Sequence, residues 1–113
     1  MKTPKDVADY LTTLIKNSGK TQATIAKESG FTTPNMITML KKGQSKIPLG
    51  RVPALAKSLG ADPAEMLNHC LEAYDPELYR VVAAVSPAML ISQKEFKIIQ
   101  ALRVASKTGA FLV

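Results

Sequence analysis

The chain is poor in the residues that most site chemistry requires. Its 113 residues include one cysteine, Cys70, one histidine, His69, and no tryptophan. A single cysteine excludes an intrachain disulfide and a metal cluster of several cysteines. The sequence also lacks a histidine–carboxylate cluster, a glycine-rich phosphate loop and a nucleophile elbow. We therefore expect no enzyme, no cofactor and no metal site.

Long hydrophobic runs are absent as well. No segment approaches about 18 uninterrupted apolar residues, the length that a membrane-spanning helix needs. The N-terminal MKTPKDVADYL has no apolar run of the kind found in a signal peptide. These absences predict a cytoplasmic protein without membrane contact.

Positive charge is present but unevenly distributed. The net charge is +6, and residues 1–60 hold ten basic and three acidic side chains, whereas residues 61–113 hold five basic and six acidic ones. All of the excess positive charge is therefore in the N-terminal half. This asymmetry indicates a domain that faces a polyanion, joined to a nearly neutral one. The alternative is a well-solvated surface without a partner.

Helix start and stop signals recur along the chain, and no segment alternates as a strand does. Cap residues, first-turn prolines and terminal glycines predict helices from Thr3 to Gly19, Thr21 to Gly30, Thr32–Thr33 to Gly43, near Leu49–Arg51 to Gly60, Asp62 to Tyr74, Asp75 to Val85 and Ser92 to Gly109. The fold class is therefore all-α, with five short helices followed by two more. Within the fifth helix, Cys70 is expected in the core and His69 at the surface.

Two of these helices are joined by a very short turn. The residues with the spacing of interest are Gln22, Ala26, Gly30, Ile37, Leu40 and Gly43. A small Ala26 lets a second helix cross closely, and Gly30 suits the left-handed backbone that ends the first helix. Ile37 and Leu40 would hold the second helix on the core and leave its start and opposite face exposed. This is the spacing of a helix-turn-helix, in which the second helix enters the major groove of DNA.

Three segments together resemble the Cro/CI (XRE-type) helix-turn-helix family of phage and bacterial transcriptional regulators. They read TQATIAKESGF at 21–31, ITMLKKG at 37–43 and VPALAKSLG at 52–60, and the resemblance covers roughly residues 5–72. It implies a five-helix, lambda-repressor-like DNA-binding domain at 1–74, with recognition helix 34–42, followed by a two-helix extension at 75–113. It also implies a homodimer on double-stranded DNA, with Gln22 bound to a backbone phosphate and bracing the recognition helix.

The spacing from Gly30 to Ile37 is one residue longer than is usual in that family. Either Thr32–Thr33 adds a residue to the turn, or Met36 takes the anchor position and the register shifts. We favour the added residue, because ITMLKKG then keeps the order of anchors and glycine that the family has. The choice decides which side chains face the bases.

In the favoured register, five side chains can reach bases from the exposed start of the helix: Thr32, Thr33, Asn35, Met36 and Met39. The amide of Asn35 can pair with N6 and N7 of adenine, and Thr33 and the methionines can touch thymine methyls. The alternatives are a capping role for Thr33 and core positions for Met36 and Met39. Because the helix has no arginine, we expect a site read largely through A·T pairs and DNA shape.

Phosphate contacts are expected around the same helix. The candidates, besides Gln22, are Lys20, Thr38, Lys41, Lys42, Ser45 and Lys46. Clustering of the lysines at one turn favours phosphates over simple solvated charge.

The extension at 75–113 is more apolar than two short helices can hide by themselves. We expect a dimer interface that includes Val81, Val82, Val85, Phe96, Ile99 and Leu102. The alternative is that these residues cap the core of the first domain.

Three functions are compatible with this pattern. The first is a sequence-specific, nucleoid-associated transcriptional regulator, a repressor, acting as a homodimer. The second is an antitoxin that binds its own operator and holds a toxin through residues 75–113. The third is a protein-interaction module that keeps the helix-turn-helix scaffold without binding DNA, against which the lysine cluster argues.

Overall fold

A computed structural model describes residues 1–107 of the chain, and it is helical, without a strand in that range. The elements are α1 (Pro4–Ser18), α2 (Gln22–Ser29), α3 (Pro34–Lys41), the 3-10 turn η1 (Leu49–Arg51), α4 (Val52–Leu59), α5 (Pro63–Tyr74), α6 (Pro76–Val85), the 3-10 turn η2 (Pro87–Leu90) and α7 (Gln93–Lys107). The predicted all-α class is therefore confirmed. The predicted end of the last helix at Thr108–Gly109 lies outside the described residues.

The helix starts are fixed by local hydrogen bonds. The Asp6 amide donates to the Thr3 hydroxyl, and the Thr3 amide donates to the Asp6 carboxylate over 2.7 Å, which is a capping box. The carboxylate of Asp62 accepts from the amides of Ala64 and Glu65 at the start of α5. Pro53 falls in the first turn of α4, directly after η1, where a missing amide costs nothing. These starts agree with the signals read from the sequence.

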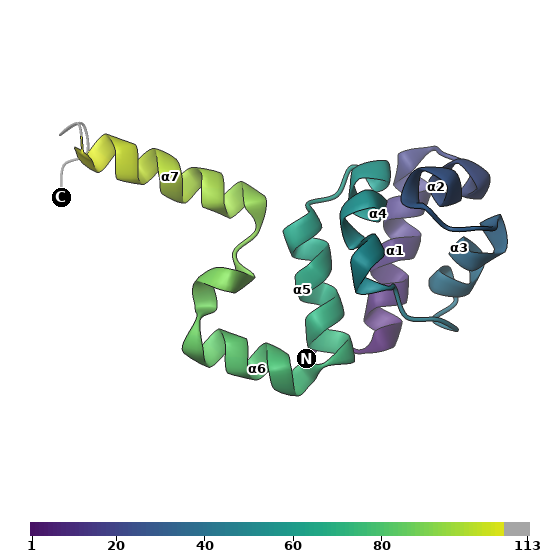
Figure 1. The fold of residues 1–113 in the computed structure, drawn as a ribbon, viewed down its shortest axis with the longest axis horizontal. Helices are drawn as coiled ribbons and strands as arrows, with labels where there is room; N and C mark the ends of the chain where they lie inside the picture. Colours follow the sequence, from purple (N-terminus) through teal and green to yellow (C-terminus); the bar gives the residue numbers. More distant parts are fainter. Residues whose placement is uncertain (108–113) are drawn as a thin grey trace.

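Helices α1 to α5 form one bundle around a common core (Figure 1). Each of them buries apolar side chains in it. The larger members are Val7, Leu11, Ile15, Ile25, Phe31, Ile37, Leu40, Ile47, Val52, Leu55, Leu59, Met66 and Cys70. The core thus lies entirely between residues 7 and 70.

The part that follows Asp75 is built differently. Asp75 ends α5 and caps α6, and neither α6 nor η2 has a buried residue. Two bonds tie this part to α5: the Asn68 side chain donates to the Leu90 carbonyl, and the Lys94 amide donates to the Asp62 carboxylate over 3.1 Å. Figure 1 shows α6 and α7 extending from one side of the bundle, and the described chain is accordingly elongated, at 53 × 31 × 20 Å. We call α6, η2 and α7 the arm; it does not cap the core.

His69 is only partly exposed, whereas the sequence analysis expected it at the surface. Its ring lies 4.3 Å from that of Tyr10 on α1, measured between centroids, and its side chain is only 14% exposed. The period of α5 places residue 69 beside the core stripe, but only the crossing of α1 over α5 covers it. Cys70 is fully buried, as expected, and burial raises the pKa of its thiol to about 11.

The partly buried imidazole predicts that stability depends on pH. Burial, reinforced by the positive charge of Lys2, lowers the pKa of His69 below its ordinary value of 6.5, although Glu65 and Glu72 oppose the shift. The folded protein therefore binds this proton more weakly than the unfolded chain does. The free energy of unfolding should be greatest above pH 6.5 and should fall as the pH drops through 6.5 toward the lower pKa of the folded state.

Urea unfolding of the wild type and of His69→Gln, followed by circular dichroism between neutral and mildly acidic pH, measures this contribution. The variant should lose less stability than the wild type on acidification. Equal slopes for the two proteins would show that His69 does not carry the effect.

Candidate nucleic-acid interface

The turn between α2 and α3 depends on Gly30. Its φ of 80° is in the left-handed region, and the amide of the next residue, Phe31, donates to the Ala26 carbonyl over 2.9 Å. Phe31 then points into the core, with 8% of its surface exposed. This geometry reverses the chain within a few residues and starts α3 at Pro34.

The inner face of α3 settles its register. Ile37 is fully buried and Leu40 is 3% exposed, whereas Met36 is only partly buried at the edge of the core. The anchors are therefore Ile37 and Leu40, the two residues that the favoured register placed on the core. Helix α3 is one residue shorter than the predicted helix 34–42, because Lys42 is its C-terminal cap rather than its last residue.

The opposite face of α3 is open to solvent. Asn35 and Lys42 are exposed, and Met39 is half-buried between them. Thr33 occupies the N-cap position, but its hydroxyl makes no capping hydrogen bond. Thr33 is therefore the N-cap residue by position only. Its side chain is exposed, and the hydroxyl is available to bind an outside partner. Thr32 instead donates to the sulfur of Met36 over 3.2 Å.

A side-chain bond joins the two helices. The Thr38 hydroxyl donates to the amide oxygen of Gln22 at the start of α2. The bond braces α3 against α2, as the resemblance implied for Gln22. Since the oxygen is used, the amide nitrogen of Gln22 remains as the donor for an outside acceptor.

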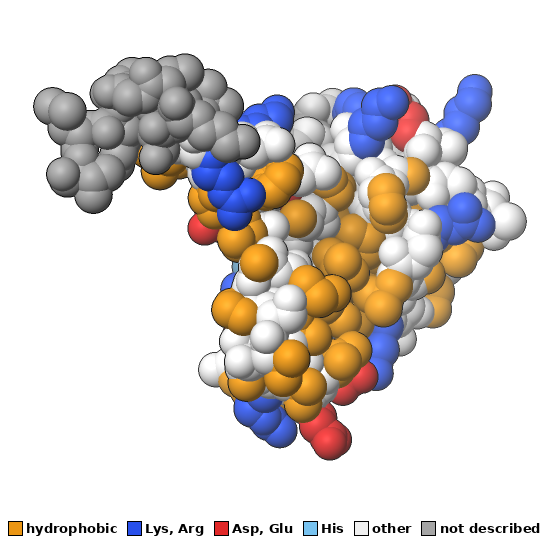
Figure 2. Space-filling view, turned by 60° about the vertical axis from the view of Figure 1, so that its left-hand side comes forward, with side chains coloured by type: hydrophobic (Ala, Val, Ile, Leu, Met, Phe, Trp, Pro, Cys, Tyr) orange, Lys and Arg blue, Asp and Glu red, His pale blue; other side chains and the backbone are white. Residues whose placement is uncertain are grey.

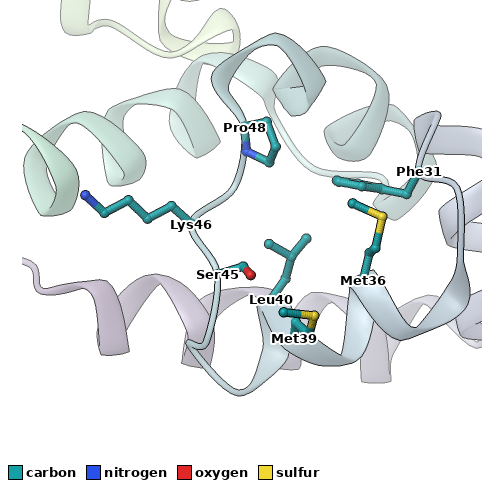
Figure 3. A pocket seen from close by; sticks show the side chains of 7 residues that line it. All are labelled: Phe31, Met36, Met39, Leu40, Ser45, Lys46 and Pro48. Atoms are coloured by element: carbon teal, nitrogen blue, oxygen red, sulfur yellow. The ribbon is translucent and has the colours of Figure 1, made fainter.

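A hollow of about 220 Å³ lies beside α3 (Figure 3). Met36, Met39 and Leu40 line one side of it, and Phe31, Ser45, Lys46 and Pro48 complete the lining. The two methionines therefore contribute to neither a closed core nor a fully exposed face. Their flexible side chains line the hollow between α3 and the segment 44–48.

Tyr74 at the end of α5 holds that segment in place. The Ile47 amide donates to the Tyr74 hydroxyl over 3.0 Å, and the Lys46 ammonium lies 5.4 Å from the centroid of the Tyr74 ring. Figure 3 shows the Lys46 side chain extending away from the hollow. Tyr74 is a positioning residue that the sequence analysis did not include, because its partners, Ile47 and Lys46, stand 27 and 28 residues earlier in the chain.

Lys20 has partners within the protein. Its ammonium donates to the Glu28 carboxylate over 2.8 Å and to the Ser58 carbonyl over 2.7 Å, and the Ser58 hydroxyl donates to the same carboxylate oxygen. The two donors lower the pKa of Glu28. Lys20 therefore links the turn before α2 to the end of α4, away from the lysines that follow α3.

The lysines after α3 have no such partner. Among the described residues, no carboxylate lies within 4.0 Å of the ammonium of Lys41, Lys42 or Lys46. No acidic residue stands between Glu28 and Asp62 in the sequence. The helix, its turn and the following loop thus present positive charge that nothing nearby in the chain neutralises.

Arg51 adds to this positive charge, and the sequence analysis did not include it among the site residues. Its guanidinium lies over the turn, since a Cβ placed on Gly30 would be 2.7 Å from Nη1 of Arg51. Arg51 is exposed and makes no ion pair within the described residues. Only the tertiary packing of η1 on the turn brings it there, so no local pattern could have indicated it.

In the described range, no three histidine, cysteine or acidic side chains are grouped so that they could hold a metal ion. No helix within residues 1–107 has the length and apolar character to cross a membrane. Comparison with protein-family models, with curated proteins and with solved structures finds no match for this chain.

The backbone φ of each glycine predicts how much an alanine at that position destabilises the protein. Gly30→Ala should lower the free energy of unfolding by about 1–2 kcal/mol because of the left-handed φ, while the flexible end of Arg51 moves aside. Gly19→Ala, at φ 68° with open space around it, should cost a similar amount. Gly50→Ala, with open space and no positive φ, should change stability by less than about 0.5 kcal/mol. Thermal melts of the three variants test this, and a loss confined to Gly30→Ala would instead implicate the Arg51 contact.

The Tyr74 hydroxyl gives a second test. Tyr74→Phe keeps the ring under Lys46 but leaves the Ile47 amide without its acceptor, which should cost about 1–2 kcal/mol of unfolding free energy. Tyr79→Phe is the matched control, because no described residue within 1–103 makes a hydrogen bond to the Tyr79 hydroxyl, and its loss should be close to neutral. Denaturant titration of both variants measures the difference, and equal stabilities would contradict the role of the Ile47 bond.

Proposed function

We propose that the chain is a sequence-specific double-stranded DNA-binding protein, in which α1 to α5 form a lambda-repressor-like domain and α3 is the recognition helix. Within this class, its sequence resembles transcriptional regulators of the Cro/CI type, and the expected action is repression as a homodimer. The activity belongs to the nucleoid, in the cytoplasm. The proposal includes no catalysis and no cofactor.

One observation supports the proposal most strongly: α3 is held by Ile37 and Leu40 so that its outer face is exposed amid lysines without carboxylate partners. A helix of this kind can lie in a major groove while the flanking charges meet phosphates. A purely structural helix would have no need of an unneutralised cluster.

The geometry suggests a division of roles. Asn35, with Met39 one turn on, faces away from the core and supplies the base contacts, and Thr33 adds a free hydroxyl at the start of the helix. Lys42 at the end of α3 and the amide nitrogen of Gln22 at the start of α2 flank this face as phosphate donors. Lys46 is held closer to α5, and Lys20 serves the protein itself, so both contribute less to binding.

The antitoxin function is the second candidate, and one specific observation favours it. The apolar side chains of the arm are largely exposed in the described chain, with Val85 79% and Met89 71% exposed. An antitoxin would cover such a surface with its toxin while binding its own operator through α3. The two functions share the DNA interface and differ in what covers the arm.

The DNA interface is tested by two substitutions on one helix. After selection of bound duplexes from a random pool, Asn35→Ala should lose about 1–3 kcal/mol on the selected site and little on random DNA. Lys42→Ala should weaken binding to every sequence and lower the slope of log affinity against log salt by about one unit. Fluorescence anisotropy titrations at several salt concentrations measure both effects.

Lys57→Ala is the control, since this exposed lysine lies on α4 beside the Lys20–Glu28 cluster rather than on α3. It should leave the affinity for the selected site nearly unchanged. Failure of the wild type to bind any duplex at low salt would refute the DNA-binding function, and equal behaviour of the Asn35 and Lys42 variants would refute the assigned roles.

A further inference from the structure

Helix α3 carries two methionines at a depth between that of the buried and that of the exposed methionines of the chain. Met66 is fully buried in the core, whereas Met1 and Met89 are each 71% exposed. Met36 and Met39 on α3 are half-buried. Met89 lies in η2, within the exposed apolar surface that Figure 2 shows on the side of the molecule to which the arm belongs. The five thioethers of the chain therefore differ in their access to solvent, and two of intermediate access are on α3.

The hollow beside α3 opens both of these side chains to small solutes. Its volume of about 220 Å³ exceeds the roughly 30 Å³ that one water molecule occupies in the liquid. Met36 and Met39 both line it, and Figure 3 shows the Met36 side chain extending from α3 toward Phe31. Hydrogen peroxide is hardly larger than water, so it can reach thioethers at this depth.

The single thiol of the chain does not compete for such an oxidant. Cys70 is fully buried, and burial raises the pKa of its thiol to about 11. Oxidation of cysteine proceeds through the thiolate, which is scarce at neutral pH when the pKa is raised. The chain also has no tryptophan. The methionines are therefore the side chains that a peroxide oxidises first.

A hydrogen bond orients one of the two sulfurs. The Thr32 hydroxyl donates to the sulfur of Met36 over 3.2 Å. A thioether sulfur has two lone pairs, and this bond engages one of them. The other lone pair is the one free to attack an oxidant, and attack from one side produces one of the two sulfoxide epimers in excess. No described residue within 1–103 donates a comparable bond to the sulfur of Met89.

Oxidation at either position would put a strongly polar oxygen in place of an apolar contact. Met36 packs against the core cluster, in a hollow that Phe31 and Leu40 also line. A sulfoxide there loosens the packing that holds α3. Met39 stands one turn after Asn35 on the outer face, so a sulfoxide there changes the surface that α3 offers to DNA.

We infer that Met36 and Met39 form an oxidation site on α3, at which a peroxide converts the thioethers to sulfoxides and thereby weakens the binding of DNA. The inference deepens the proposed function and rests on it, since a loss of affinity requires that α3 bind DNA. In the step, a sulfur lone pair attacks one oxygen of hydrogen peroxide and the O–O bond breaks. The second oxygen leaves as hydroxide and takes the proton of the first to become water. Sulfur loses two electrons, and a methionine sulfoxide reductase that draws on thiols returns them.

Peptide mass spectrometry of the full chain during exposure to hydrogen peroxide at neutral pH tests the site. Met36 and Met39 should be oxidised at rates within about tenfold of the rate of Met89, because reactivity follows exposure. Met66 should react at least about a hundredfold more slowly than Met89, because only opening of the core exposes it. Rates at Met36 and Met39 as low as that at Met66 would overturn the inference.

Fluorescence anisotropy on the selected duplex, before and after oxidation, measures the effect on binding. Oxidation should raise the dissociation constant of the wild type at least about fivefold, because each sulfoxide places a polar group in an apolar contact. Reductases for both sulfoxide epimers should then restore the original value. In the double variant Met36→Leu/Met39→Leu, the ratio of the dissociation constants after and before oxidation should be about one, whatever the affinity of the unoxidised variant. A loss that persists in this variant would overturn the assignment to α3.

Met89→Leu is the matched control. Met89 is the more exposed thioether, but it lies in η2 and outside α3. This variant should lose affinity on oxidation by the same factor as the wild type, within about twofold. A response that disappears in Met89→Leu would place the sensitive sulfur on the arm and contradict the inference.

The Thr32 hydroxyl provides a test that does not involve DNA. Digestion with reductases specific for each epimer, followed by peptide mass, should find one epimer of the Met36 sulfoxide in excess by about two- to threefold, as a weak hydrogen bond allows. Thr32→Val should reduce this excess. Thr33→Val is the control and should keep it, because the Thr33 hydroxyl makes no capping bond. Equal reduction of the excess by both variants would overturn the role of the Thr32 bond.

The remaining outcomes separate this inference from the proposed function. A wild type that binds the selected duplex equally well before and after complete oxidation of Met36 and Met39 overturns the inference and leaves the DNA-binding function intact. An unoxidised wild type that binds no duplex at low salt refutes the DNA-binding function and, with it, the control of binding by oxidation. In that case the peptide masses still decide whether α3 carries the oxidation site.

Discussion

Burial of Ile37 and Leu40 is the constraint on which the rest of the candidate site depends. Helix α3 has eight residues, which is too short to be stable by itself in water. Each fully buried side chain of this size contributes about 1.5–3 kcal/mol, more than helix propensity over two turns can supply. The same two side chains fix the rotation of α3 about its axis. Because Ile37 and Leu40 face the core, Asn35 and Lys42 on the opposite side of the helix face the solvent.

Polar contacts then limit how α3 and its surroundings can move. The Thr38–Gln22 bond holds α3 to α2, and the Thr12 hydroxyl reaches the Lys41 carbonyl at the end of α3 over 3.4 Å. On the other side, Tyr74 fixes the backbone of the segment 44–48. A surface held in this way gives up little conformational freedom on binding, which favours affinity for a rigid groove. The side chains of Met36 and Met39, which line the hollow, are the part of this surface that can change conformation on binding.

The sequence predicted the helices well because their signals are local. Caps such as Thr3 and Asp62, and first-turn prolines such as Pro34, act within one turn, so each helix start could be read from a few residues. The favoured register of α3 agrees with the structure, in which Ile37 and Leu40 are buried, but the sequence left Met36 open as an anchor because Met36, Met39 and Leu40 also form a helical apolar face. Tertiary partnerships could not be read in the same way. Lys20 meets Ser58 across 38 positions of sequence, Lys46 meets Tyr74 across 28, and His69 is covered only once α1 crosses α5. Such pairings depend on the crossing angles between helices, and the hydrophobic periodicity of the sequence does not predict these angles.

The lack of any buried side chain in α6 and η2 has a consequence for local unfolding. An element with little buried apolar area opens at a cost well below that of the whole molecule. Amide hydrogens of the arm should thus exchange with solvent through local opening of the arm, whereas those of α1 and α4 should exchange only when the whole bundle unfolds. Whatever covers the arm adds its binding free energy to that opening step. Protection of the α6 amides against hydrogen exchange therefore reports whether a partner is bound to the arm. The arm can open or close without unfolding the bundle that carries α3.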